Sequence, residues 1–378
     1  MNVTEKIVWA AGGLAFLGGA VGLVQRAQSG HTVAAYGSYV PWGLWVGLYT
    51  VLVGMSAGAF LLAAVSLGFG VERLQGLARP ALLIALATFV GGMLAIWLDL
   101  GRPLRAGRLF VATNFTSMMG WMAWANVAYA AVLLLLLWQA VWLGRTRPGV
   151  VRTLGLLGVL LVVVFSGTEG AVFGVVGARA FWNSGLTPLK FLIEAALSGV
   201  ALVTCFSILF GVLEAPLVQT MRRTILGLLL AAILVEFAEL SIGYYTAIPA
   251  YAASQALVFS GPFWWVFWLV HVAAGVAAPL GLLILAGRRR WGLALATGLI
   301  AVTALSAKLN LVIAAQAVPA FEELRIAYTG PGLTVAYFPT AVEFLTALWI
   351  VGVVALFAVA GHHVLPLRLG ARSAGGPA

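Results

Sequence analysis

Charged side chains are scarce in this sequence. Only 8% of the 378 residues are Asp, Glu, Lys or Arg, while 63% are apolar, whereas soluble domains are roughly one-quarter charged. The single cysteine, Cys205, can supply neither an internal disulfide nor a cysteine-held iron–sulfur cluster. No polar segment is long enough to build a soluble core of its own. The chain is therefore predicted to lie in a membrane.

Long apolar runs recur along the whole chain, and each can cross a hydrocarbon core of about 30 Å as a helix. The short alternating strands of a membrane barrel are absent from the sequence. We predict an all-α integral membrane protein, a single polytopic domain over residues 1–378, whose first run is a retained helix rather than a signal peptide. Its ten spans lie at about residues 8–25, 42–70, 80–99, 119–144, 153–178, 190–213, 224–250, 263–287, 292–317 and 340–366.

The net charge of +10 reflects membrane topology rather than nucleic-acid binding, because Lys and Arg gather in the short connections. Thirteen lie on the side of the two termini, and Lys308 lies within a span. The opposite side has only seven: Arg26, Arg102, Arg105, Arg108, Arg179, Lys190 and Arg325. The excess predicts that both termini are cytoplasmic.

Ionisable side chains occur inside most of the predicted spans. They are Asp99, Glu169, Glu194, Glu236, Glu239, His271, Lys308 and Glu343. Each costs several kcal/mol in a bilayer unless it faces protein, water or a partner. At about 1.5 Å per residue, most of them fall in the half of the membrane away from the termini, as does Asn126, while Glu236 falls near the middle.

Several interpretations of this polar cluster remain open. It could be a structural ion-pair network, such as Lys308 with a glutamate, or a proton or ion path through Glu236 and Glu239, which would also suit a stand-alone transporter. It could also be a quinone site near the outer surface, since a quinol needs acceptors for two hydroxyl protons and an apolar slot for its ring. Only one of the four histidines, His271, lies well inside a span, so a haem held by two histidines is not expected.

Four segments near the outer ends of the spans resemble signatures of a known family. They are Trp97-Leu98-Asp99-Leu100-Gly101-Arg102-Pro103 with Asn114-Phe115-Thr116-Ser117-Met118-Met119-Gly120-Trp121, then Arg179-Ala180-Phe181-Trp182-Asn183-Ser184-Gly185-Leu186-Thr187-Pro188-Leu189, and Tyr337-Phe338-Pro339-Thr340-Ala341-Val342-Glu343. Together they are similar to the NrfD/PsrC family of quinone-interacting membrane subunits, in its ten-helix HybB/DsrP-type branch.

The resemblance implies two four-helix bundles plus additional helices in a bacterial or archaeal cytoplasmic membrane. The protein would be the haem-free anchor of a respiratory complex, reacting with menaquinone or ubiquinone without holding the catalytic centre. Electrons would pass to a four-cluster iron–sulfur subunit on the periplasmic side, beside a molybdopterin, hydrogenase or multihaem cytochrome subunit.

Carried over by position, the quinone-binding residues are Asp99 and Arg102, with Asn126 and Glu169 as neighbours. The family's usual histidine and tyrosine beside the head group have no evident counterpart in the sequence. A second hypothesis gives a proton half-channel to four further residues: Glu236, Glu239, His271 and Lys308. No metal site is predicted.

Overall fold

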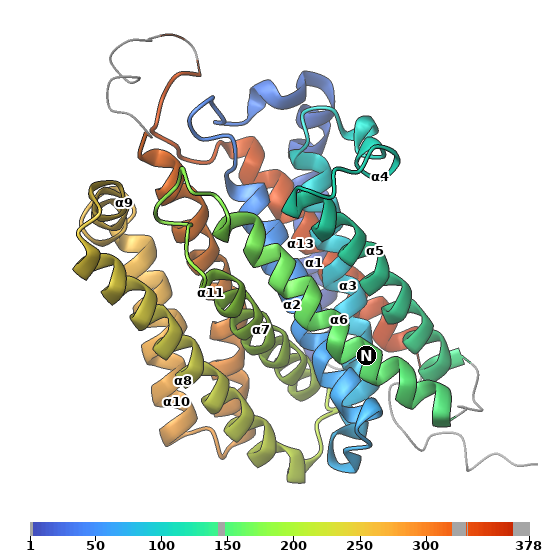
Figure 1. Ribbon diagram of the computed structural model, residues 1–378. Helices are drawn as coiled ribbons and strands as arrows, with labels where there is room; N and C mark the ends of the chain where they lie inside the picture. The colour runs from blue at the N-terminus through green and yellow to red at the C-terminus, as the bar shows by residue number, and fades with distance from the viewer. Residues whose placement is uncertain (1–2, 143–147, 320–329, 331, 366–378) are drawn as a thin grey trace, which may run out of the picture.

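The protein forms a bundle of long helices (Figure 1). The computed structural model describes residues 3–142, 148–319, 330 and 332–365. Ten helices in these ranges are long and apolar enough to cross a membrane, and no strand occurs in them. The predicted all-α membrane fold with ten spans is confirmed.

The spans fall into two four-helix bundles and an extra pair, as predicted. The first bundle holds α2 (Leu44–Gly68), α3 (Gln75–Asp99), α5 (Met118–Leu137) and α6 (Pro148–Gly174). The second holds α7 (Thr187–Leu209), α8 (Ala215–Thr246), the π-helix η5 (Val266–Ala277) continued by α10 (Ala278–Leu285), and α11 (Arg290–Ala317). The extra pair is α1 (Val3–Ser29) and α13 (Ala341–Val364). Short elements connect them: η1 (Gly30–Val33), η2 (Glu72–Leu74), η3 (Pro103–Arg105), α4 (Arg108–Val111), η4 (Trp138–Trp142) and α9 (Pro249–Phe259).

Some helix boundaries differ from the prediction. The helix α8 begins at Ala215, well before residue 224, because Pro216 suits a first helical turn and the polar stretch that follows simply continues the helix. It ends at Thr246, where Ala247 takes a left-handed conformation with φ of 49°. The helix α9 then follows, a connecting element that the hydropathy pattern did not indicate.

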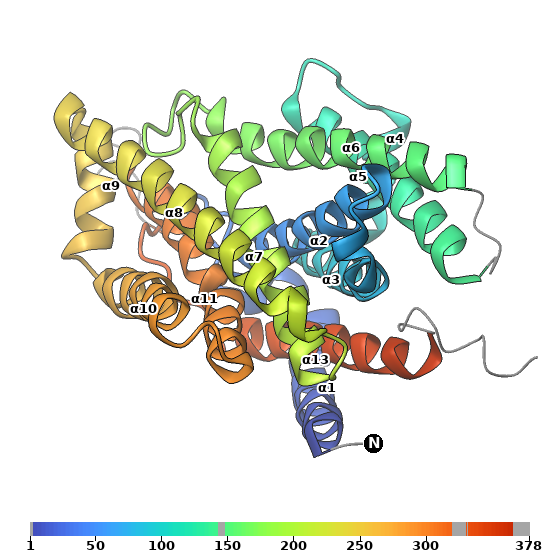
Figure 2. The same cartoon turned by 90° about the horizontal axis from the view of Figure 1, so that it is seen from below.

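The two bundles meet along α2 and α7, which lie at the centre of the molecule in both views (Figures 1 and 2). Gly58 of α2 and Gly199 of α7 lie so close to the opposite backbone that a Cβ at either position would overlap it. Small residues of this kind let helices approach closely in lipid, where packing rather than hydrophobic burial holds helices together.

The helices α1 and α13 pack against each other, and α13 also packs on α3. Glu5 near the start of α1 lies 3.9 Å from both His362 and His363 near the end of α13. The start of α1 and the end of α13 therefore lie on one side of the molecule, which we call the termini side. The opposite side, where α3 ends at Asp99, is called the Asp99 side.

Candidate functional site: two buried polar clusters and a cavity between the bundles

Asp99 is buried at the last residue of α3, with 7% of its surface exposed. It faces Arg26 near the end of α1 and Tyr36 in the connection to α2. The Arg26 guanidinium is itself fixed to the backbone, because it donates hydrogen bonds to the carbonyls of Leu98 (3.0 Å) and Leu100 (2.8 Å). We call Arg26, His31, Tyr36 and Asp99 the Asp99 cluster.

Three buried polar atoms of this cluster lack a hydrogen bond of full geometry, although the Tyr36 hydroxyl and the Asp99 carboxyl face each other. The three atoms are Nε2 of His31, the hydroxyl of Tyr36 and Oδ1 of Asp99. Buried polar atoms in folded proteins are nearly always paired, so each such atom in a native structure needs an explanation. The cluster therefore holds polar atoms from three segments whose hydrogen-bonding capacity is incompletely used.

Aromatic rings surround these atoms. The ring of Tyr36 lies 5.1 Å from that of His31, 5.8 Å from Trp45 and 5.9 Å from Tyr337, measured between centroids. Burial, and next the Asp99 carboxyl, raise the pKa of Tyr36 well above 10. Its hydroxyl therefore stays protonated at neutral pH and can act as a donor.

Glu169 belongs to a second cluster in the first bundle. Its carboxylate accepts a hydrogen bond from the Tyr49 hydroxyl of α2 and another, at 3.3 Å, from the side-chain amide of Asn126 in α5. Only 4% of the Glu169 surface is exposed. The structure thus brings together two of the predicted quinone-binding residues, Asn126 and Glu169. Asp99 shares no hydrogen-bond partner with them among the described residues.

Arg102 lies in neither cluster. Its side chain is exposed and makes no hydrogen bond or ion pair to a described residue. The turn after α3 therefore places Arg102 on the surface, while Asp99, three residues earlier, faces the interior.

The second bundle contains three buried ion pairs, each of which joins two helices. Lys308 of α11 lies 2.6 Å from Glu194 of α7. The other pairs are His271 with Glu236 at 2.8 Å and Lys190 with Glu239 at 2.7 Å. The pairing of Lys308 with a glutamate was one of the interpretations of the sequence and is confirmed. The Lys308 ammonium also lies 3.1 Å from the centroid of the Phe191 ring, a cation–π contact.

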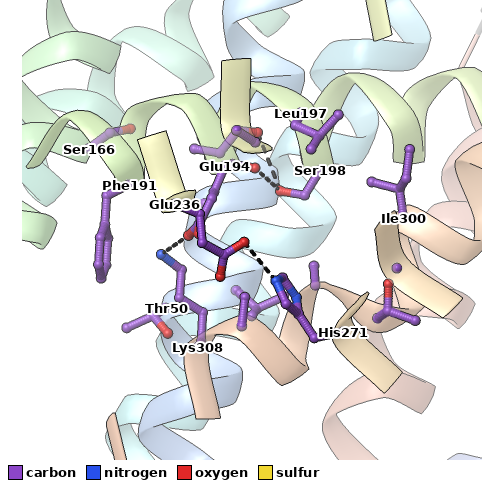
Figure 3. A pocket seen from close by; sticks show the side chains of 18 of the residues that line it. Thr50, Ser166, Phe191, Glu194, Leu197, Ser198, Glu236, His271, Ile300 and Lys308 are labelled. Atoms are coloured by element: carbon purple, nitrogen blue, oxygen red, sulfur yellow. Dashed lines mark hydrogen bonds and ion pairs between the residues drawn. The ribbon is translucent and has the colours of Figure 1, made fainter. Parts of the chain in front are cut away.

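A cavity of about 70 Å³ lies between the two bundles (Figure 3). Its ionisable lining residues are Glu169, Glu194, Glu236, His271 and Lys308. An apolar cavity of about 150 Å³ holds one benzene ring, whereas about 10–15 Å³ suffices for a water. The cavity therefore suits a few water molecules rather than a quinone ring. Glu239 does not line it, so only three of the four residues of the predicted proton path meet there.

The formal charges of the six residues in these three ion pairs nearly cancel. Three carboxylates face two lysines and a histidine there: Glu194, Glu236, Glu239, Lys190, Lys308 and His271. With His271 neutral and the others ionised, they carry one net negative charge, and with His271 protonated they carry none. Since a net charge inside a membrane is costly, one bound proton would leave these six groups neutral.

His271 is aimed at this cavity by an unusual helix. In the π-helix η5, each backbone N–H donates to the carbonyl five residues earlier, instead of four as in an α-helix. The buried residues of η5 are Phe267, His271 and Gly275. We attribute the wide turn to Pro279, which follows in α10. A proline has no N–H to donate, and its ring clashes with the carbonyl four residues earlier, here that of Gly275.

Sequence reasoning missed His31, Tyr36, Tyr49 and Arg26 as site residues. His31 lies just beyond the first predicted span, and a tyrosine carries no charge at neutral pH, so neither stands out among the ionisable residues inside the spans. The signal available in the sequence is the aromatic-rich stretch 31–45, which leads into α2.

The geometry defines a polytopic membrane protein with polar clusters at one end and between its bundles. The family model described as polysulphide reductase, NrfD, matches residues 32–320. The protein belongs to this family, as the sequence motifs predicted.

Several curated proteins are similar to it over most of their length. The C subunit of the selenate reductase of Mesobacillus selenatarsenatis is 26% identical over 89% of this chain and 88% of its own. The Hdr-like menaquinol oxidoreductase integral membrane subunit of Archaeoglobus fulgidus is 28% identical over 87% and 85%. The C polypeptide of the polysulfide reductase of Wolinella succinogenes is 27% identical over 43% and 58%. These relatives are named as oxidoreductase subunits, one of them as an integral membrane subunit. This protein shares their family and has ten helices that can cross a membrane.

Proposed function

We propose that this protein binds quinol at the Asp99 cluster and passes its electrons to an extramembrane partner subunit. The observation that carries the proposal is the buried group of polar atoms on His31, Tyr36 and Asp99, whose hydrogen-bonding capacity is not fully used. They lie among aromatic rings at one end of the first bundle. A quinol head group has two hydroxyls and a flat ring, which suit these atoms and these walls. The relative named as a menaquinol oxidoreductase subunit supports the same substrate class.

Oxidation of one quinol to quinone releases two electrons and two protons. In our proposal the Asp99 carboxylate accepts one hydroxyl proton and Nε2 of His31 accepts the other, while the Tyr36 hydroxyl donates a hydrogen bond to the head group. The reverse reaction, quinone reduction, uses the same groups. The two electrons leave to a cofactor of the partner, which must lie close because the site is at a helix end.

The partner and the orientation are further parts of the proposal, and the orientation rests on the distribution of Lys and Arg in the sequence. We place the termini in the cytoplasm of a bacterial or archaeal cell and the Asp99 side in the periplasm. A four-cluster iron–sulfur subunit would dock there, beside a molybdopterin, hydrogenase or multihaem subunit. The relatives named as selenate and polysulfide reductase subunits support a reductase complex of this type.

The Glu169 cluster is proposed to take protons onward from the head group. Glu169 lies five residues before the end of α6, about 8 Å deeper than the helix end. Asn126 and Tyr49 hold its carboxylate by hydrogen bonds. Because Glu169 also lines the cavity between the bundles, it links the first bundle to the ionisable groups of the second.

The experiment that tests quinone binding uses the protein purified gently with its partner subunits. We expect the isolated complex to oxidise a menaquinol or ubiquinol analogue, or to reduce the quinone, with electrons passing through the partner. A protein that purifies alone, shows no quinone-dependent reaction and moves ions across vesicles would instead be the stand-alone transporter.

A proton path is a second candidate function, favoured by the cavity and by its buried ion pairs. In this proposal, water in the cavity connects Glu169 to the Glu236–His271 pair, which holds one proton and passes it on. The ion pair of Glu194 and Lys308 also lines the cavity and supplies the other charged groups that face it. The path would couple quinone chemistry to proton movement across the membrane.

Glu236→Gln tests the proton path because it keeps the side-chain shape but removes the titratable group. In reconstituted vesicles we expect a lower ratio of protons moved to electrons transferred, with turnover of artificial donors retained. The matched control is Glu214→Gln, an exposed glutamate on the termini side. An unchanged ratio in Glu236→Gln, equal to that of the control, would exclude the pair from the path.

A further inference from the structure

The loop between α3 and α5, residues 100–117, carries an unbalanced positive charge. Arg102, Arg105 and Arg108 follow one another at intervals of three residues, and all three side chains are exposed. None of them forms an ion pair or a side-chain hydrogen bond with a described residue. The sequence holds no Asp or Glu between Asp99 and Glu169. This arginine loop therefore lacks a nearby anion within its own stretch of sequence.

The same loop exposes large apolar side chains. Leu104 is 94% exposed and Val111 is 91% exposed, and Phe115 follows at 54%. A loop that lies in water normally turns such residues inward or lacks them. Arginine and exposed apolar side chains together fit the headgroup layer of a membrane, which offers phosphates and the ends of acyl chains at one depth.

Two tryptophans of α5 hold the loop in place. Nε1 of Trp121 donates to the Phe115 carbonyl at 2.8 Å, and Nε1 of Trp124 donates to the Thr113 hydroxyl at 3.0 Å. Both rings are still partly exposed, at 51% and 42%. Tryptophan is enriched at this depth of membrane proteins, where its ring is apolar and its N–H is bonded.

The loop also lies at the rim of the molecule. It projects past α6 at the edge of the protein in Figure 2, and in Figure 1 α4 lies beyond α5 on the Asp99 side. A segment in that position overhangs lipid, whereas a docking surface for a protein would lie above the helix ends.

We propose that the arginine loop lies in the headgroup layer on the Asp99 side and binds anionic phospholipids of the phosphatidylglycerol type. The three guanidiniums contact lipid phosphates, and Leu104 and Val111 enter the acyl boundary. The proposal is independent of quinone binding. It assigns the loop to lipid rather than to a partner subunit.

The location is tested with single-cysteine probes, since Cys205 is the only cysteine in the sequence. In a Cys205→Ser background, fluorophores on Leu104→Cys and Val111→Cys should be quenched by spin-labelled lipid and protected from aqueous iodide. The control is Glu72→Cys, in the exposed turn on the termini side, whose fluorophore should be quenched by iodide. Iodide quenching of the two loop probes equal to that of the control would overturn the proposal.

The lipid selectivity is tested by changing all three arginines at once. In bilayers of mixed phosphatidylglycerol and phosphatidylcholine, the native complex should retain the anionic lipid in severalfold excess. The triple variant R102Q/R105Q/R108Q should lose that excess, and R102K/R105K/R108K, which keeps the charge, should retain most of it. An unchanged lipid preference in the glutamine variant, with or without loss of a co-purifying subunit, would overturn the proposal. Loss of the subunit would then assign the arginines to a protein partner.

Discussion

Replacing Asp99 with asparagine is expected to lower quinol-dependent turnover of the complex by at least about a hundredfold, the usual loss when a positioned proton acceptor is removed. Asparagine has nearly the same shape but cannot take a proton from a quinol hydroxyl. Arg26 keeps its hydrogen bonds to two backbone carbonyls in the variant, so the local fold should persist. The measurement is turnover with a quinol analogue beside turnover with a soluble artificial donor, which bypasses the site.

The control for this prediction is Glu72→Gln, which removes an exposed carboxylate on the termini side. Both variants should keep artificial-donor turnover and their full set of subunits. Only Asp99→Asn should lose the quinol reaction. Quinol turnover of Asp99→Asn at the level of Glu72→Gln would remove Asp99 from the chemistry.

The second large effect is expected from Glu194→Ala, because it leaves Lys308 without its partner inside the membrane. The Lys308 side chain is only 7% exposed and its ammonium lies 2.6 Å from the glutamate. Breaking a buried pair by removing one member typically costs about 3–5 kcal/mol, since the remaining charge is uncompensated. The free energy of unfolding in detergent, measured against denaturant, should fall by about that amount.

The matched comparison replaces both members, as Glu194→Gln with Lys308→Gln. This double variant removes both charges at once, so it should recover most of the stability that Glu194→Ala loses. It should still show a reduced proton-to-electron ratio, because the cavity wall has lost its charges. Exposed ion pairs typically contribute less than about 1 kcal/mol. If Glu194→Ala lowers the free energy of unfolding by no more than that, Lys308 must reach water or another partner.

The fold was predictable because hydropathy alone fixes which segments cross a membrane. The predicted span 42–70 and the observed α2, Leu44–Gly68, differ by only two residues at each end. The helix α9 was missed for the same reason, since eleven residues are too few to form a span. The predicted and observed boundaries differ most at helix ends near the membrane surface, as at Ala215 of α8, because polar residues can extend a helix into the headgroup layer.

The site was predictable only in part, because side-chain partners depend on helix rotation. Depth along each helix placed Asn126, Glu169 and Lys308 in the same half of the membrane, and the family resemblance made Asn126 and Glu169 neighbours. The structure shows that Asn126 contacts Glu169 and that Lys308 contacts Glu194. Depth could not show that Glu239 pairs with Lys190 away from the cavity. Depth also could not show that the connection between α1 and α2 folds so that His31 and Tyr36 lie beside Asp99.

The π-helix shows why rotation escapes a hydropathy argument. His271 reaches Glu236 from a helix whose turns are wider than those of an α-helix, which changes the direction of every side chain in it. Pro279 is visible in the sequence, but a proline can also kink a helix or end it. The sequence alone does not distinguish these outcomes, whereas the structure shows a π-helix that packs on α11.

The most direct test of the central claim is a structure of the complex with a quinol-site inhibitor or quinone bound. The account predicts a head group within hydrogen-bonding distance of Asp99, His31 and Tyr36, at the end of the first bundle. A head group found beside Glu194 and Lys308 in the second bundle, or on the partner subunit alone, would contradict it.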